Sequence, residues 1–207
     1  MGAREEILGR LQAQANLVAM PSAWVSRRRF DDLAVQFDEA LTAVGGEVIR
    51  VVDFDDAMAA LGGLLRELKV EKGVVNGERP LLNADLPHHF PKIEWHIVGE
   101  TDGALRDFCA VADVGISGAA AALAETGSVL IESGAGKSRL ATLLPPVHIV
   151  LLAAERITAD LFTWTAARGA LPPMNMTFVS GPSKTADIEQ TLAVGVHGPK
   201  RFIVILW

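Results

Sequence analysis

Apolar positions recur in the first part of the chain with the spacing of helices. Residues from Arg4 to about Met20 predict a helix that stops before Pro21. A second helix, ended by Gly45-Gly46, is predicted by apolar residues three or four positions apart. These residues are Phe30, Leu33, Ala34, Phe37 and Leu41. We expect residues 1–45 to form a helical N-terminal segment.

Strand and helix patterns alternate after this segment. Residues 47–53 predict a strand, and Asp53 or Asp55 is placed to cap a following helix. The inward face of that helix is predicted to hold Met58, Leu61, Leu65 and Leu68. Further strands are predicted at 73–76, 94–98, 176–179 and 201–206, further helices at 102–112 and 154–168, and an irregular connection at 80–91.

The stretch from Gly115 to Ala153 is the part around which the chain is organised. Three short apolar runs, bounded by Gly or Pro, predict buried strands of one sheet. The first run ends at Ile116, the second covers residues 128–131 and the third covers residues 147–152. An Ala-rich half-turn closing in Glu125-Thr126-Gly127-Ser128 joins the first two, and a Gly-rich loop, residues 133–139, joins the second two.

This alternation predicts an α/β fold with an open, mainly parallel sheet and helices on both faces. The chain of 207 residues, half of them apolar, can bury one full core, so we expect residues 1–207 to form a single domain. Ligands of such sheets collect outside the carboxyl ends of the strands. Small, hydroxyl-bearing and basic residues recur in the loops that leave those ends.

Composition narrows the chemistry. The single cysteine, Cys109, excludes a disulfide framework, a Cys-ligated zinc site and an iron–sulfur cluster held by this chain alone. A reducing cytoplasm is the expected setting. The N-terminal residues lack the apolar core of a signal peptide, and no run approaches the roughly 18 apolar residues of a membrane span.

Charge is distributed unevenly along the chain. Residues 1–117 hold 12 basic and 19 acidic side chains, whereas residues 118–207 hold 7 and 6. An acidic half without a basic stripe argues against nucleic-acid binding, although Arg27-Arg28-Arg29 is a local exception that we expect to be solvated. His88-His89 has no further ligands at metal-binding spacing, so we assign the pair no role and predict no metal site.

The Gly-rich loop resembles a phosphate-binding P-loop only at its end. Gly136-Lys137-Ser138 reproduces the last part of that motif, but the required glycine five positions earlier is Ile131, within a strand. Two interpretations remain for the loop. Its backbone N–H groups at Gly134 and Gly136 could bind an anion beside Lys137 and Arg139. Alternatively, it is a sharp turn flanked by solvated basic residues.

Several single residues are candidates for chemistry, each with a structural alternative. Glu125 precedes a Thr-Gly turn and could act as acid, base or nucleophile, or cap the turn. His148 lies inside an apolar strand, where a hydrogen-bonded core histidine is the simpler interpretation. His197, between Gly195 and Gly198, is the better functional candidate because glycine-flanked turns expose side chains.

A second polar loop follows the predicted strand at 176–179. Ser180, Gly181, Ser183 and Lys184 either form an anion-binding loop or start a helix stabilised by Asp187 and Glu189. Because both basic loops follow strands of what should be one sheet, we expect Lys137, Arg139 and Lys184 to converge on one small-anion site.

Five motifs resemble a known family. They are Gly115-Ile116-Ser117-Gly118, Ala124-Glu125-Thr126-Gly127-Ser128, and the segments at 143–149, 180–189 and 195–199. Together they resemble the lactate-utilisation protein C family, which carries the LUD domain. The motif-bearing part is residues 113–206, and the resemblance upstream is one of layout only. The ligand-binding candidates in or beside these motifs are Gly118, Thr126, Gly127, Gly134, Gly136, Lys137, Arg139, Ser180, Gly181, Ser183, Lys184 and His197.

The resemblance implies a fold similar to the NagB/RpiA/CoA-transferase superfamily. It also implies a part in oxidising L-lactate to pyruvate beside partner proteins that carry iron–sulfur clusters, with no cofactor in this chain. One departure is the run Ala119–Ala122, which stands where the family usually has an acidic and then an aromatic residue.

Two functions follow as alternatives. The chain is a binding or structural subunit of the lactate system, or it is an enzyme on its own. The enzyme would act on a carboxylic acid, thioester or phosphorylated molecule with Glu125 as catalytic carboxylate.

Overall fold

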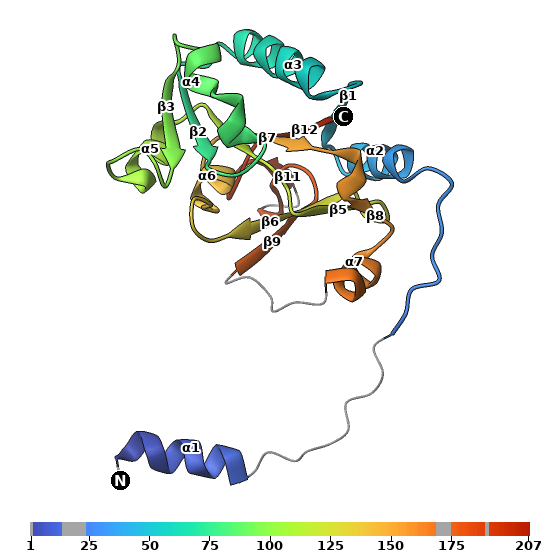
Figure 1. Cartoon of the computed structure of the whole chain (residues 1–207), viewed down its shortest axis with the longest axis vertical. Helices are drawn as coiled ribbons and strands as arrows, with labels where there is room; N and C mark the ends of the chain where they lie inside the picture. The colour runs from blue at the N-terminus through green and yellow to red at the C-terminus, as the bar shows by residue number, and fades with distance from the viewer. Residues whose placement is uncertain (1, 14–23, 169–174, 189–190) are drawn as a thin grey trace.

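A six-stranded parallel sheet is the centre of the fold. The computed structural model describes residues 2–13, 24–168, 175–188 and 191–207. The strand order is β1-β12-β7-β4-β2-β3, and every neighbouring pair is parallel (Figure 1). The mainly parallel α/β fold predicted from the sequence is thereby confirmed. The strands are β1 (Glu47–Arg50), β2 (Lys72–Asn76), β3 (Glu94–Val98), β4 (Val114–Ser117), β7 (Val147–Leu152) and β12 (Arg201–Leu206).

A second, four-stranded sheet has the order β8-β5-β6-β9. It contains β5 (Ala121–Leu123), β6 (Ser128–Ser133), β8 (Ile157–Thr158) and β9 (Asn175–Val179). The prediction that β6 joins the same sheet as its sequence neighbours is therefore wrong. The Ala-rich part of the predicted half-turn is instead the strand β5, antiparallel to β6, and the expected turn follows it at residues 124–127. Alanine has a low strand propensity, but Ala121 and Ala122 are buried, and burial overrides propensity here.

The two faces of the parallel sheet support separate parts of the core. Ile203 and Ile205 of β12 pack with α3 (Phe54–Glu67), whereas Phe202 and Val204 pack with α2 (Leu33–Ala43) and the second sheet. Fully burying a side chain of this size contributes about 1.5–3 kcal/mol. Because successive residues of a strand point to opposite faces, β12 stabilises both layers. Helices α5 (Leu105–Val111) and α6 (Leu140–Leu143) pack in a third cluster.

Aspartate residues fix where the two long helices begin. The Asp32 carboxylate accepts hydrogen bonds from the N–H groups of Ala34 and Val35, at 2.8 and 3.0 Å, and so caps α2. Asp53 caps α3 by accepting from the N–H of Asp56 at 2.9 Å. Of the two caps predicted for α3, Asp53 is the one observed.

The N-terminal segment is helical only in part. Helix α1 (Ala3–Ala13) has no buried residue and lies apart from the sheets in Figure 1. Its predicted continuation to Met20 lies outside the described residues. Residues 24–32 contain neither helix nor strand before α2.

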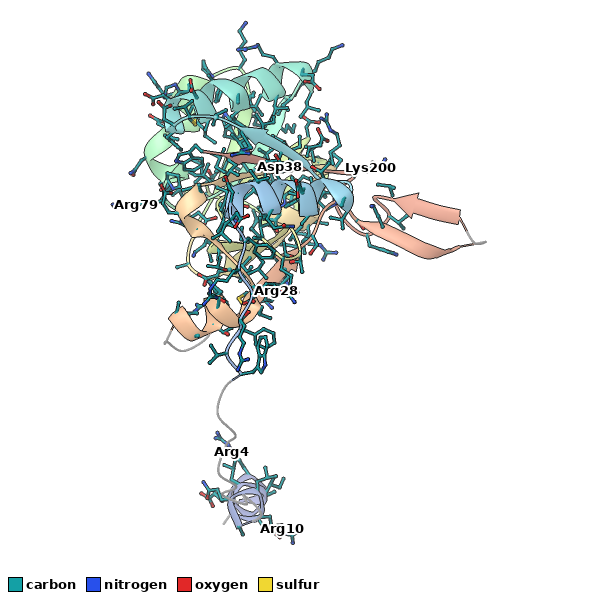
Figure 2. The ribbon with its side chains drawn as sticks, turned by 90° about the vertical axis from the view of Figure 1, so that its right-hand side faces the viewer. Arg4, Arg10, Arg28, Asp38, Arg79 and Lys200 are labelled. Carbon is teal, nitrogen blue, oxygen red and sulfur yellow. The ribbon has the colours of Figure 1, made fainter. Side chains whose placement is uncertain are left out.

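Three further connections differ from the sequence expectation. The stretch predicted as a helix over 154–168 is a 3-10 turn (Ala154–Arg156), then β8, then α7 (Leu161–Arg168). The Asp160 carboxylate caps the start of α7 by accepting a hydrogen bond from the N–H of Thr163 at 2.8 Å. The irregular stretch at 80–91 contains a 3-10 turn, η1 (Leu81–Ala84), and α4 (Leu86–His89). Strands β10 (Lys184–Ile188) and β11 (Thr191–Val194) form a hairpin that projects from the body (Figure 2).

Among the described residues, no helix has the length and apolar character needed to cross a membrane.

Candidate functional site

The topology places a crevice at the carboxyl ends of β2 and β4. After β2 the chain continues to β3 on one side, and after β4 its next strand in this sheet is β7 on the other side. The chain therefore leaves these two adjacent strands in opposite directions. In open parallel sheets, ligands bind where the strand order reverses in this way. Asn76, Gly77 and Glu78 leave β2 at this point, and Ser117 and Gly118 leave β4.

Glu78 is the acidic group at this crevice. Its Oε1 accepts a hydrogen bond from the backbone N–H of Gly118 at 2.9 Å, and its Oε2 lies 3.8 Å from Nζ of Lys137. Only 14% of the Glu78 side chain is exposed. Burial raises the pKa of this carboxyl, and the opposing effects of Lys137, the Gly118 N–H and Arg156 do not cancel that increase.

The Gly-rich loop forms a tight turn over the end of β2. Gly134 and Lys137 exchange backbone hydrogen bonds of 3.1 and 3.0 Å. The carbonyl of Gly136 accepts from the N–H of Gly77 at 2.7 Å, and Asn76 Oδ1 accepts from the N–H of Ser138 at 2.9 Å. With φ at 69° and the Gly77 oxygen 2.8 Å from where a Cβ would lie, Gly136 cannot carry a side chain without strain. These contacts dock the turn on β2 and place Lys137 beside Glu78.

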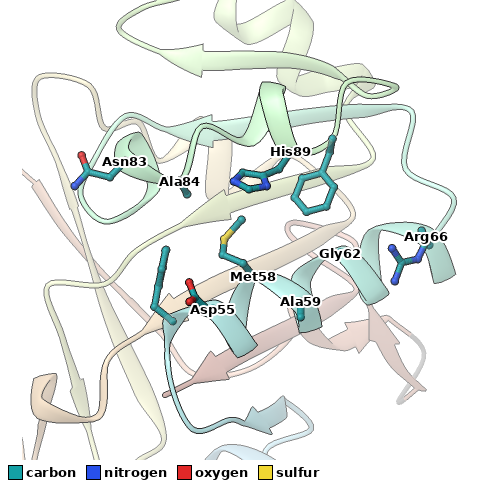
Figure 3. Close-up of a pocket in the computed structure, with 10 residues that line it drawn as sticks. Asp55, Met58, Ala59, Gly62, Arg66, Asn83, Ala84 and His89 are labelled. Atoms are coloured by element: carbon teal, nitrogen blue, oxygen red, sulfur yellow. The ribbon is translucent and has the colours of Figure 1, made fainter.

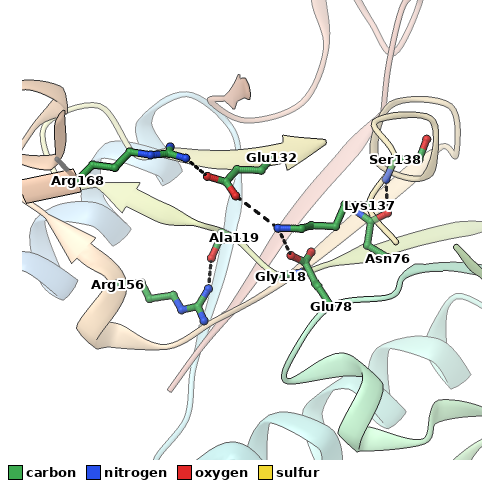
Figure 4. Close-up of polar contacts among 9 residues, drawn as sticks. All are labelled: Asn76, Glu78, Gly118, Ala119, Glu132, Lys137, Ser138, Arg156 and Arg168. Carbon is green, nitrogen blue, oxygen red and sulfur yellow. Dashed lines mark hydrogen bonds and ion pairs between the residues drawn. The ribbon is translucent and has the colours of Figure 1, made fainter. Parts of the chain in front are cut away.

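Charged groups of alternating sign continue from Lys137 into the second sheet. Nζ of Lys137 lies 3.4 Å from Oε2 of Glu132, and the other oxygen of Glu132 lies 2.8 Å from a guanidinium nitrogen of Arg168 (Figure 4). Nearby, Arg156 donates to the carbonyl of Ala119 at 2.6 Å. Arg168, Glu132, Lys137 and Glu78 thus form a connected chain of ion pairs, which we call the charge chain.

A cavity of about 780 Å³ opens on the outer side of the turn. The Lys137 side chain is 28% exposed and Arg139 is exposed. Within the described part of the chain, Arg139 makes no ion pair, and the buried Ser133 hydroxyl has no hydrogen-bond partner. Two cations and a hydroxyl donor are groups that can bind a small anion. The cavity is lined by Ser133, Gly134, Ala135, Lys137, Ser138, Arg139, Leu140 and Asn175.

Lys184 does not join this cavity. Its Nζ donates to the carbonyl of Val44 at 2.6 Å, immediately before β1, and the N–H of Ser183 donates to the carbonyl of Pro199, just before β12. These positions are at the amino ends of the parallel strands, whereas Lys137 lies at the carboxyl ends. The expected convergence of Lys137, Arg139 and Lys184 is therefore wrong. Lys184 also begins a strand, not a helix, so that alternative is wrong as well.

A separate group of predicted residues meets at the end of α2. The hydroxyls of Thr126 and Ser128 are 2.7 Å apart, and those of Ser128 and Ser180 are 2.6 Å apart. Gly127 and Gly181, both with positive φ, pack against the last turn of α2 and the residues that follow it. Ser128, which is buried, starts β6, and Ser180 directly follows β9. The row of hydroxyls therefore joins the start of β6 to the end of β9.

Glu125 and His197 lie away from the cavity. Glu125 forms an ion pair with Arg28, and its N–H donates to the carbonyl of Ala159 at 3.0 Å. It precedes the start of β6, while Glu132 of the charge chain is near the end of that strand. His197 is exposed, as predicted for a glycine-flanked turn.

Sequence reasoning identified Gly118, Gly134, Gly136, Lys137 and Arg139 as ligand candidates but missed the acidic and basic partners around them. The missed residues are Glu78, Glu132, Arg156 and Arg168. The sequence did hold one signal for Glu78, which follows Asn76-Gly77 directly after a buried strand.

A second groove, of about 580 Å³, lies between α3 and the η1–α4 connection (Figure 3). Met58 and Phe90 give it an apolar wall, and Asp55, Arg66 and His89 add polar groups.

Among the described residues, no group of three or more His, Cys, Asp or Glu side chains is placed to hold a metal ion.

Fold and site together define an α/β protein with a parallel sheet and a charged cavity beside its switch point. The chain belongs to the LUD domain family, which it matches over residues 34–207. That range includes both sheets and every residue of the charge chain. The family resemblance predicted from the motifs is confirmed.

Individual relatives agree with this assignment. The chain is 42% identical over 101 residues to lactate utilization protein C of Halalkalibacterium halodurans, an alignment covering 46% of this chain and 44% of that one. It is 36% identical over 101 residues to lactate utilization protein C of Bacillus subtilis, covering 46% and 42%. These alignments span less than half the length of the relatives.

A solved structure supports the fold. The crystal structure of a DUF162 family protein from Deinococcus radiodurans superposes with a TM-score of 0.57 at 19% sequence identity. The superposition covers 84% of this chain and 95% of that one.

Proposed function

We propose that the chain is a subunit of a system that oxidises L-lactate to pyruvate, in which iron–sulfur partner proteins carry the electrons. Membership of the LUD domain family and the lactate-utilisation names of its relatives support this role. With one cysteine, buried in the fold, the chain has no ligand set for a cluster of its own. Electron transfer therefore falls to the partners.

Within this system, the chain binds a small carboxylate in the cavity beside the Gly-rich turn. The observation that carries this part is the pair of cations Lys137 and Arg139, which line the cavity at the carboxyl ends of the parallel strands. The buried hydroxyl of Ser133, which has no partner among the described residues, lies next to them. Charge-assisted hydrogen bonds to carboxylates are stronger than neutral ones. Lactate and pyruvate carry the negative charge that these two cations can pair with.

Two experiments test the two parts of the proposal. Deleting the gene should abolish growth on L-lactate as sole carbon source while leaving growth on pyruvate intact. Calorimetric titration of the purified chain with L-lactate and with pyruvate should show binding at fixed ionic strength. Normal growth of the deletion strain on lactate would remove the pathway role, and absence of heat with both anions would remove the site.

The alternative is an enzyme that acts alone, with Glu125 as catalytic carboxylate. Its ion pair with Arg28 and its distance along β6 from the cavity give it no specific support. Turnover of carboxylic acids or thioesters by the purified chain without partners, lost in Glu125→Gln, would favour this alternative.

A further inference from the structure

Lys137 is shared between the interior of the protein and the cavity. Its ammonium group carries three N–H donors. Glu132 lies at hydrogen-bond distance, 3.4 Å, whereas the 3.8 Å to Glu78 is longer than a hydrogen bond. The Lys137 side chain also lines the cavity. Lys137 is therefore held less tightly by Glu78 than by Glu132. An anion that enters the cavity weakens the Lys137–Glu78 interaction first.

The two carboxylates beside Lys137 are not equivalent. Glu132 has a second cation, Arg168, at 2.8 Å, so it keeps an ion-pair partner when Lys137 turns to a ligand. Glu78 has no second cation at that distance within the described residues. Its other oxygen accepts only the backbone N–H of Gly118, and the nearby guanidinium of Arg156 donates to the carbonyl of Ala119. Losing part of the Lys137 interaction thus affects Glu78 most.

We propose that the cavity takes up a small carboxylate together with a proton, and that Glu78 is the residue that accepts this proton. The inference rests on the proposed carboxylate site and adds its coupling to protonation. When Glu78 starts ionised, one anion and one proton enter together, Glu78 becomes the neutral acid, and the net charge of the site is preserved. Oε1 of Glu78 continues to accept from the N–H of Gly118, while Oε2, once protonated, becomes an O–H donor.

The groups facing Glu78 give this coupling its direction. Lys137 of the turn and Arg156 after β7 favour the ionised form, and Glu132 of β6 and burial favour the neutral form. The pKa of Glu78 is already raised in the free protein. A bound anion adds a further negative charge near Lys137 and Glu78, which raises the pKa of Glu78 further, and by linkage the anion binds more tightly when Glu78 is protonated.

Calorimetry tests the coupling with pyruvate and L-lactate as probes. Titrations in two cationic buffers of different ionisation enthalpy, imidazole and bis-tris, report the protons taken up on binding. We expect uptake of between zero and one proton. We also expect affinity to fall by up to about ten-fold per pH unit above the pKa of Glu78. In Glu78→Gln the uptake should vanish and the affinity should lose its pH dependence.

The control is Glu94→Gln. Glu94 forms an exposed ion pair with Lys72 at 3.0 Å on β3, so this variant removes a lysine-paired carboxylate far from the cavity and should keep the proton uptake of the wild type. Infrared difference spectra of the wild type provide a second readout that does not depend on a variant folding. Adding the anion should produce the C=O band of a protonated carboxyl.

The outcomes separate the two proposals. Binding of pyruvate or lactate without proton uptake overturns the coupling and leaves the carboxylate site standing. Uptake that persists in folded Glu78→Gln overturns the assignment to Glu78. Absence of binding of either anion to the wild type overturns both the site and its coupling.

Discussion

Oγ of Ser117 and Nε2 of His148 lie 2.8 Å apart in a hydrogen bond between two side chains that are both fully buried. Ser117 ends β4 and His148 lies in the adjacent β7. Within the described residues, Nδ1 of His148 has no partner. Burial lowers the pKa of His148 from 6.5 to about 3, so the ring is neutral in the folded protein. The interpretation of His148 as a hydrogen-bonded core residue agrees with this geometry.

His148 should make the protein sensitive to mild acid. The unfolded chain binds a proton at His148 below pH 6.5, whereas the folded chain does not until about pH 3. Stability should therefore fall as pH decreases through this window, with a slope from this residue of about 1.4 kcal/mol per pH unit. Urea unfolding between about pH 5 and 6.5 measures the slope. His148→Gln should reduce it, and exposed His197→Gln should not; equal slopes in the wild type and His148→Gln would contradict the assignment.

Glycine positions provide a matched test of the packing. A Cβ at Gly115 of β4 would lie 1.8 Å from the carbonyl oxygen of Ala141 in α6, so Gly115→Ala should destabilise by about 3 kcal/mol or more. A Cβ at Gly63, within α3, meets no atom within 4 Å. Gly63→Ala should stabilise by about 0.5–1 kcal/mol because alanine is the better helix former. Denaturant unfolding compares the two, and a tolerated Gly115→Ala would refute the close approach of α6 to β4.

The parallel sheet could be predicted from the sequence because its strands carry dense apolar runs. In β7 and β12, successive residues pack on opposite faces, so nearly every position is apolar and the run is visible. In the second sheet, β6 and β9 showed this signal, but β5 and β8 did not. Its strand β5 is built from Ala121 and Ala122, whose small side chains show no strand preference, and β8 is only two residues long.

Only the part of the site that lies in the Gly-rich turn could be predicted from the sequence. The Gly-rich turn gave Lys137 and Arg139, because glycines and basic residues stand together in the sequence. Glu78 and Arg168 lie far from them along the chain. The position of Glu78 after a buried strand marks it as a loop residue, but no local pattern pairs either residue with the turn. Lys184 was misplaced because its loop was assumed to leave a strand of the parallel sheet, whereas β9 belongs to the other sheet.

The isolated chain should be colourless and free of iron. Cys109 is its single cysteine, and burial raises the pKa of the thiol to about 11. A buried thiol that stays protonated is a poor metal ligand and a poor nucleophile. We expect no iron–sulfur absorbance in the purified protein and slow alkylation of Cys109 until denaturant is added. Iron–sulfur absorbance that survives removal of partner proteins would contradict this prediction.

Removing a positive charge from the cavity should weaken anion binding, whereas removing one from the loop that holds Lys184 should not. Lys137→Ala and Arg139→Ala each remove a charged donor from the cavity that we propose for the carboxylate. A charge-assisted hydrogen bond contributes about 1.5–3 kcal/mol when partly desolvated, so each variant should weaken binding of pyruvate or L-lactate by about ten-fold or more. Lys184→Ala is the matched control, because Lys184 donates to Val44 at the opposite edge of the sheet.

Lys184→Ala should leave the affinity within about two-fold of the wild type, since a surface charge beyond a Debye length of roughly 8 Å is largely screened at physiological salt. Calorimetric titration at fixed ionic strength provides the comparison, with thermal unfolding to show that each variant is folded. Lys137→Ala also leaves Glu78 and Glu132 without their shared cation, so Lys137→Gln serves as a second variant of more similar size. If Lys184→Ala weakens binding as much as Arg139→Ala, the ligand occupies the amino ends of the strands and the cavity assignment is wrong.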